Sequence, residues 1–111
     1  MLDVLAFFVA DLGLDMLSIY PFLGGGVDSA EVEVHKFPEK AGPRHFVFSK
    51  DDTILYVINE LNSTITAYKR NETGAYGVLE TQSTLDKDFK GDSYCADIRL
   101  SSDGRFLYGS N

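Results

Sequence analysis

The sequence has few of the features that mark several common classes of protein. Its single cysteine, Cys95, cannot form an internal disulfide, so no secreted disulfide framework is present. No catalytic signature surrounds Cys95, and we expect it to be a small buried hydrophobic residue. The chain has ten Lys and Arg and seventeen Asp and Glu, which gives a net charge of -7. This balance argues against a nucleic-acid partner, because binding to phosphates needs a basic surface.

Signals for a membrane, a metal or a bound phosphate are also weak. The apolar run from Val4 to Ala10 is too short to cross a bilayer, and Asp3 stands where a signal peptide would carry basic residues. We therefore expect a cytoplasmic protein without membrane association. No His, Cys or Asp cluster has the spacing of metal ligands, and Gly24-Gly25-Gly26 lacks the residues of a phosphate loop. The sequence thus predicts no metal or cofactor, and a loose connection at the glycines.

Short segments rich in Val, Ile, Phe, Tyr and Thr alternate with clusters of Gly, Asp, Asn and Ser, and no convincing helical pattern occurs. This pattern is typical of strands and tight turns, so we predict an all-β fold. The predicted strands are Leu5–Ala10, Met16–Pro21, Val32–Phe37, Arg44–Ser49, Ile54–Asn59, Thr64–Arg70, Gly77–Thr84, Cys95–Leu100 and Arg105–Ser110.

Three parts of the chain resemble one another. The segment from Phe48 to Tyr56 matches the segment from Leu100 to Tyr108 at an offset of 52 residues, with Ser, Asp, Leu and Tyr in common. Ile65-Thr66-Ala67-Tyr68 matches Leu17-Ser18-Ile19-Tyr20 at an offset of 48 residues. Strand-rich repeats of about 40–50 residues are blades of β-propellers, each a four-stranded antiparallel sheet.

The repeats predict a partial propeller of about two four-stranded blades. Residues 1–37 are expected to form part of one blade, residues 38–92 about one full blade, and residues 93–111 the start of the next. A propeller closes with about 4–8 blades, so we expect the chain to be a fragment of a longer ring. Unclosed blade faces are apolar, which favours self-association through them.

Several motifs, taken in their order and spacing, resemble the lactonase family of seven-bladed propellers. They are Gly42-Pro43-Arg44-His45-Phe46, Tyr56-Val57-Ile58-Asn59-Glu60-Leu61, and the stretch from Ser102 to Asn111. That family includes propeller-type 6-phosphogluconolactonases and carboxy-muconate lactonising enzymes. Its proposed active site uses a histidine, two arginines and a glutamate around the central channel. The resemblance places one arginine at Arg44 and the glutamate at Glu60, with the histidine before Met1 and the second arginine after Asn111.

The residues give partial support of their own to Arg44 and Glu60 as catalytic residues. If the intervening turn is centred near Asp52, Arg44 lies opposite Glu60, whereas a slip of one residue pairs Arg44 with Asn59. In the repeat these charges align with Ala96 and Leu12, so the scaffold does not require them. From spacing alone, an ion pair that closes a blade edge is an equally good interpretation.

The remaining polar residues are assigned to the scaffold. Asp11, Asn59 and Asn111 share one repeat position, which predicts a polar cap there. His45 is expected on the strand face opposite Arg44, as a hydrogen-bonded packing residue in preference to a base, although a histidine beside a channel leaves the role of a base open. His35, in an acidic stretch, is expected to be exposed.

The resemblance implies hydrolysis of a sugar lactone, with 6-phosphogluconolactone as the leading substrate. Arg44 would bind the developing anion and Glu60 would take a proton from water or orient it. Two alternative interpretations stay open at this point: a non-catalytic propeller scaffold for protein interaction, or an inactive truncated product.

Overall fold

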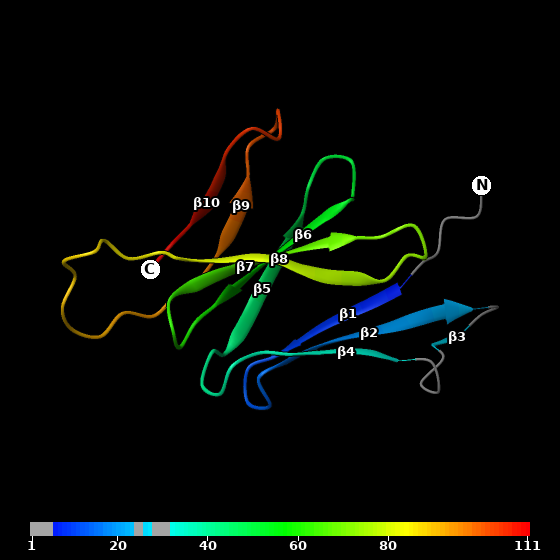
Figure 1. The fold of residues 1–111 in the computed structure, drawn as a ribbon, viewed down its shortest axis with the longest axis horizontal. Coiled ribbons are helices and arrows are strands. Elements are labelled where there is room, and N and C mark those ends of the chain that lie inside the picture. Colours follow the sequence, from blue (N-terminus) through cyan, green and yellow to red (C-terminus); the bar gives the residue numbers. More distant parts are fainter. Residues whose placement is uncertain (1–5, 24–25, 28–31) are drawn as a thin grey trace.

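The computed structural model describes residues 6–23, 26–27 and 32–111, and its regular elements are all strands (Figure 1). Three antiparallel sheets follow one another along the chain. We call them the first, second and third blade. The first blade contains β1 (Ala6–Asp11), β2 (Met16–Leu23), β3 (Gly26–Val27) and β4 (Glu33–Lys36); the second contains β5 (Pro43–Phe48), β6 (Ile54–Asn59), β7 (Thr64–Arg70) and β8 (Tyr76–Ser83); the third contains β9 (Ile98–Leu100) and β10 (Leu107–Gly109).

The all-β partial propeller predicted from the sequence is therefore confirmed. All nine predicted strands have a counterpart, although β9 and β10 are shorter than expected. The prediction missed β3, in which Gly26 and Val27 pair with Leu23 and Phe22. The glycine-rich stretch is thus not wholly a loose connection, and Gly24 and Gly25 lie outside the described residues.

The internal repeat is visible in the geometry of two hairpin turns. In the second blade, Asp51 accepts hydrogen bonds from the Ser49 hydroxyl (2.8 Å) and from the Thr53 N–H (3.2 Å). In the third blade, Asp103 accepts the equivalent bonds from Ser101 and Arg105, at 2.6 and 3.1 Å. The following residues also correspond, because Asp52 and Gly104 both have a positive φ, 61° and 75°. The aligned sequences therefore encode the same turn, held by an Asp side chain.

Residues on opposite faces of the second blade pack into two different cores. Leu55 and Val57 of β6 join Leu17 of the first blade in one buried cluster. Ile58, the next residue along the strand, joins Cys95 and Ile98 in a second cluster beside the third blade. Because the second blade is covered on both sides, its inner strands are continuous hydrophobic runs instead of alternating ones.

β5 lies where the sheets converge, since it contacts β1 of the first blade and β9 of the third. Figure 1 shows the three sheets fanning out from this region, with the long connection from β8 to β9 projecting in yellow and orange. β5 is therefore the inner strand of its blade, on the side where a closed propeller has its central channel.

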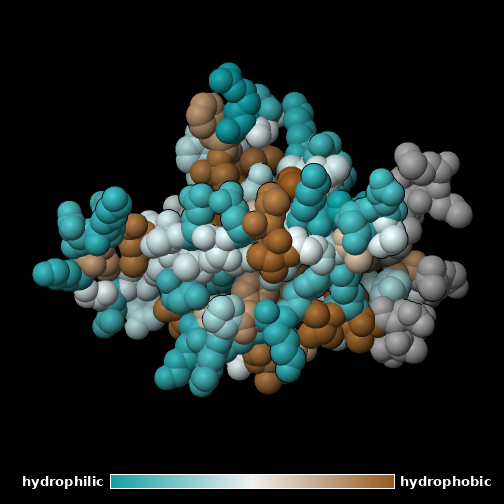
Figure 2. Space-filling model, viewed as in Figure 1, coloured by the Kyte–Doolittle hydropathy of each residue, from teal (hydrophilic) through white to brown (hydrophobic). Residues whose placement is uncertain are grey.

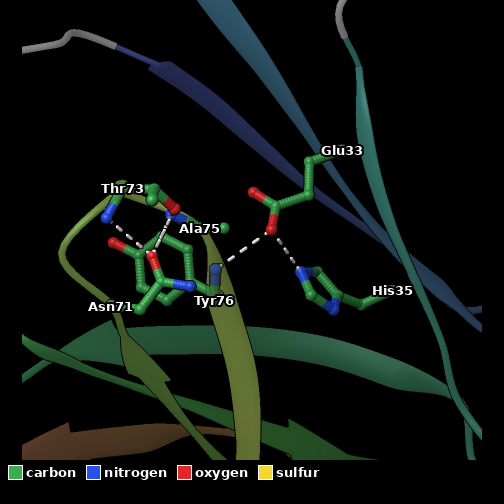
Figure 3. A network of polar contacts seen from close by, with 6 residues as sticks. All are labelled: Glu33, His35, Asn71, Thr73, Ala75 and Tyr76. Atoms are coloured by element: carbon green, nitrogen blue, oxygen red, sulfur yellow. Dashed lines mark hydrogen bonds and ion pairs between the residues drawn. The ribbon is translucent and has the colours of Figure 1, made fainter.

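A polar contact links the outer parts of the first and second blades (Figure 3). The Glu33 carboxylate on β4 accepts hydrogen bonds from the Tyr76 N–H on β8 and from His35 Nε2, both at 3.0 Å. The His35 ring also lies 5.0 Å from the Tyr68 ring, centroid to centroid. The expectation that His35 is exposed is wrong, because the ring packs between the two blades.

Large apolar side chains remain on the surface of the described residues. Phe106 and Tyr108, in the β9–β10 hairpin, are 54% and 59% exposed. Figure 2 shows hydrophobic surface beside this hairpin, at the top of the view. Within the described ranges, no helix has the length and apolar character needed to cross a membrane.

Candidate functional site

The site predicted from the sequence lies where β5 begins. Gly42 precedes the strand with a φ of 68°, a conformation that costs glycine little. A Cβ placed on Gly42 would lie 2.6 Å from Cγ of Leu61, so the close approach of the two turns also requires glycine. Pro43 then pairs with Asn59, and its side chain is fully buried.

A β-bulge follows at once and decides the position of Arg44. Pro43 pairs with Asn59 and His45 pairs with Ile58, so Arg44 is an extra residue without a cross-strand partner. A bulge of this kind bends the strand and re-aims its side chains, and bulges are common beside functional sites. The orientation of Arg44 therefore follows from an irregularity in the sheet.

The predicted register between Arg44 and Glu60 is wrong, yet the two side chains meet. Phe48 pairs with Leu55, which centres the hairpin half a residue before Asp52. An unbroken ladder would then set Arg44 against Asn59. The bulge shifts the register by one more residue in the same direction, so that Asn59 pairs with Pro43. The Arg44 guanidinium nonetheless donates from Nη1 to Oε1 of Glu60, so the side chains make the contact without help from the ladder.

Backbone hydrogen bonds fix Glu60 at the junction of two blades. Its N–H donates to the Gly42 carbonyl at 2.7 Å, and its carbonyl accepts from the Cys95 N–H at 3.2 Å. The Arg44 and Glu60 side chains are 42% and 21% exposed, so both are accessible from solvent. The pair thus presents a guanidinium from the inner strand beside a carboxylate from the turn that follows β6.

The polar cap predicted at one repeat position is confirmed, although its three members bond differently. Asp11 accepts from the Leu14 N–H at 3.0 Å. Asn59 Nδ2 donates to the hydroxyls of Thr64 and Thr66, at 2.9 and 3.1 Å. Asn111 Nδ2 donates to Thr84 Oγ1 at 3.0 Å and to Ser93 Oγ at 3.1 Å. Each side chain secures the turn or connection at the end of its strand.

His45 also departs from the sequence-based expectation of a packing residue, because its side chain is exposed. His45 pairs with Ile58, so it lies on the face of the second blade that looks toward the third. Asp97 lies just before β9 and aligns with His45 in the repeat. The sequence assigns it no role, and this alignment is the signal that points to it.

Asp97 is an ionised carboxylate held by neighbouring donors. Its Oδ2 accepts from Arg99 Nε and its Oδ1 accepts from the Ile98 N–H, both at 2.9 Å. The pKa of the Asp97 carboxyl is lowered first by the hydrogen bond from Arg99 and then by the one from Ile98. The positive charge of Arg99 lowers this pKa further.

Cys95 is a buried free cysteine, as predicted. Its Sγ lies 3.3 Å from Thr84 Oγ1 and 3.6 Å from Asn111 Nδ2, neither of which is a base. Among the residues that the structure describes, no three His, Cys, Asp or Glu side chains are grouped as metal ligands.

A cavity of about 400 Å³ lies away from Arg44 and Glu60, between the first and second blades. Its walls include Phe8, Phe48 and Tyr76, and Asp52 and Arg70 stand at its edge. Asp52 lies in the turn between β5 and β6 and Arg70 ends β7, both at the opposite end of the strands from Glu60. The cavity therefore does not serve the Arg44–Glu60 pair.

Comparison with known proteins gives a consistent assignment. A family model described as a lactonase, 7-bladed beta-propeller, matches residues 5–111. The chain is 41% identical over 102 residues to an uncharacterised protein of Lactococcus lactis subsp. cremoris, covering 91% of this chain and 30% of that protein. It is 35% identical over 105 residues to a 6-phosphogluconolactonase of Buchnera aphidicola subsp. Acyrthosiphon pisum, covering 91% of this chain and 31% of that protein.

Solved structures agree with the fold. A protein from Lactobacillus plantarum superposes with a TM-score of 0.84 at 36% identity, covering 95% of this chain and 31% of that one. The Pseudomonas aeruginosa periplasmic gluconolactonase PpgL superposes with a TM-score of 0.82 at 28% identity, covering 92% and 29%. The chain thus spans about 30% of the length of the curated relatives that it matches.

Proposed function

Because the chain belongs to the lactonase family of seven-bladed β-propellers, we propose that it supplies part of the active site of a sugar lactonase. The observation that carries this proposal is the contact between Arg44 and Glu60 across the bulge at the start of β5. The Buchnera relative is named 6-phosphogluconolactonase, and 6-phosphogluconolactone is the substrate we propose first.

The Arg44–Glu60 pair suits the hydrolysis of a lactone. Water attacks the ring carbonyl carbon, and negative charge develops on the carbonyl oxygen. Arg44 offers a guanidinium that binds this oxygen, or an anionic group of the substrate, through directed hydrogen bonds. Glu60 takes the proton from the attacking water. The remaining blades would supply the other walls of the channel.

A purely structural role for the pair explains little. Both side chains are partly exposed, and an ion pair of that kind contributes only about 0–1 kcal/mol to stability. The backbone bonds of Glu60 already hold its turn, and they do not depend on its carboxylate. A charged pair that adds so little stability on the inner strand is better explained by binding or catalysis.

The test is kinetic and uses the complete gene product that contains this chain. Glu60→Gln is expected to lower kcat for 6-phosphogluconolactone by about 10²–10⁴-fold. Arg44→Met is expected to lower kcat/KM by about 10²-fold or more, with partial recovery in Arg44→Lys. Glu80→Gln, an exposed glutamate of β8, is the matched control and should keep full activity.

Activity of Glu60→Gln within a few-fold of the unmutated protein would overturn the catalytic assignment. A complete protein without lactone hydrolysis would instead favour the scaffold interpretation. The same assay on the 111-residue chain decides whether the fragment is active by itself.

We propose a cytoplasmic location. The single cysteine is free and buried, which fits a reducing compartment, although the related PpgL is described as periplasmic. Cell fractionation with a tagged full-length protein tests this assignment, and recovery outside the cytoplasm would overturn it.

A further inference from the structure

The cavity between the first and second blades has an apolar wall drawn from both sheets. The Phe8 ring of β1 lies 5.0 Å from the Phe48 ring of β5 and 5.9 Å from the Tyr76 ring of β8, centroid to centroid. Both pairs are edge-to-face, an arrangement that aromatic rings favour. The buried Ile19 of β2 adds to this wall. The volume of about 400 Å³ falls within the range of small-molecule sites, about 300–1,000 Å³.

Charged groups from three different elements surround the apolar wall. Glu33 of β4, Asp52 of the turn between β5 and β6, and Arg70 at the end of β7 all line the cavity. The Arg70 guanidinium packs against the turn at Gly74, where a Cβ would lie 3.7 Å from Nη2. Among the residues that the structure describes, no carboxylate lies within ion-pair distance of Arg70. With its five N–H donors, this guanidinium can bind a ligand in the cavity.

Glu33 and Tyr76 are held in position by the contact between the two blades. The Tyr76 N–H and His35 Nε2 both donate to Oε1 of Glu33, at 3.0 Å. Figure 3 shows the second carboxylate oxygen of Glu33 turned away from these donors, so it can accept from a ligand. Burial raises the pKa of the Tyr76 hydroxyl, which is therefore protonated at neutral pH and can donate a hydrogen bond.

The combination of charges selects one kind of ligand. A simple anion could bind Arg70 but would be repelled by Glu33 and Asp52, and a simple cation would be repelled by Arg70. A neutral apolar molecule would cover the wall but leave the charged groups desolvated without partners. A molecule with one carboxylate, one ammonium group and an apolar body satisfies all of these groups at once.

We propose that the cavity binds a free α-amino acid with an apolar side chain. Arg70 and the Tyr76 hydroxyl bind the α-carboxylate, the guanidinium through two parallel hydrogen bonds. The carboxylates of Glu33 and Asp52 bind the ammonium group. The apolar side chain lies along the Phe8 ring, where its burial supplies the non-directional part of the affinity.

This site is separate from the Arg44–Glu60 pair and does not rest on the proposed function. It lies at the opposite end of the strands from Glu60. Its residues come from two blades, with Glu33 on the first and Arg70 on the second. A bound amino acid therefore stabilises the packing of these blades against each other.

The first test compares four ligands on the unmutated complete gene product by isothermal titration calorimetry. L-Leucine carries both charges, 4-methylpentanoate lacks the ammonium group, 3-methylbutylamine lacks the carboxylate, and glycine lacks the side chain. L-Leucine should bind. Each of the other three should bind about 10-fold more weakly or worse, because each loses either a charge-assisted contact or the apolar one.

Two substitutions then test whether L-leucine binds in this cavity. Arg70→Met should weaken L-leucine by about 10-fold or more, yet 3-methylbutylamine should bind no more weakly, since it makes no use of the guanidinium. Asp52→Asn should weaken L-leucine but not 4-methylpentanoate. An analogue that still binds shows that the variant is folded. Lys69→Met, at the exposed neighbour of Arg70 that does not line the cavity, is the matched control and should keep full affinity.

The outcomes decide the proposal without reference to the lactonase. L-Leucine that fails to bind the complete protein would overturn it, and so would binding that neither substitution weakens. If 3-methylbutylamine binds as tightly as L-leucine, the cavity is a site for cations and the role of Arg70 is refuted. Lactone hydrolysis by Arg70→Met should match that of the unmutated protein, so a failure of the proposed function leaves the amino-acid site untouched.

Discussion

Arg44 contacts Glu60 although the β-ladder gives it no cross-strand partner. The ladder between β5 and β6 is one residue out of the register that would set the two opposite each other, and the bulge at Arg44 shifts it by a further residue. The two side chains nevertheless meet beside the bulge. The pair therefore depends on a local irregularity, held by the buried Pro43 and by the tight approach of Gly42 to Leu61.

Replacing Gly42 with alanine should destabilise the fold. The positive φ of Gly42 disfavours any Cβ, and the added atom would clash with Leu61. We expect a loss of about 1–3 kcal/mol in the free energy of unfolding, measured by urea denaturation. Gly77→Ala is the control, because a Cβ at Gly77 has open space around it, and a similar loss there would refute the explanation.

The stability of the fold should decrease as the pH falls below about 4. Hydrogen bonds lower the pKa of Asp51, first from the Thr53 side chain and then from Ser49, and the pKa of Asp103 is lowered in the same way. A carboxyl whose pKa is lower in the folded state than in the unfolded state stabilises the protein at any pH above the unfolded pKa. This stabilisation is lost as the pH falls through the pKa of the folded state.

Asp51→Asn removes one of these groups and should make Tm less dependent on pH between about 3 and 6. Thermal unfolding monitored by circular dichroism at several pH values measures the slope. Asp88→Asn, an exposed residue of the long connection, is the control. An unchanged slope in Asp51→Asn would contradict the assignment.

The isolated 111-residue chain should self-associate through its exposed blade faces. Phe106 and Tyr108 leave a large apolar surface on the third blade, and a second copy would cover it. Sedimentation at increasing concentration should show oligomers that Tyr108→Lys weakens. Val78→Lys, an equally exposed position on β8, is the comparison. A monomeric unmutated chain would refute this prediction.

Much of the fold could be predicted because propeller blades carry local signals. The turns of Asp51 and Asp103 are encoded by side chains that bond to their own loop, so sequence similarity reports them directly. The burial of Ile58 and Cys95 also followed from their hydrophobic character. By contrast, β3 was missed because glycine carries no side chain whose pattern would indicate a strand.

The sequence by itself determined nine of the ten described strands, the repeat and the presence of one arginine and one glutamate near the inner strand. Only the tertiary structure decided how they meet. Register depends on turn geometry and on one extra residue at Arg44, and a change of one position reverses a side chain. The shared core of Ile58 and Ile98 likewise requires two blades to pack together, because residues far apart in sequence become neighbours only through tertiary packing.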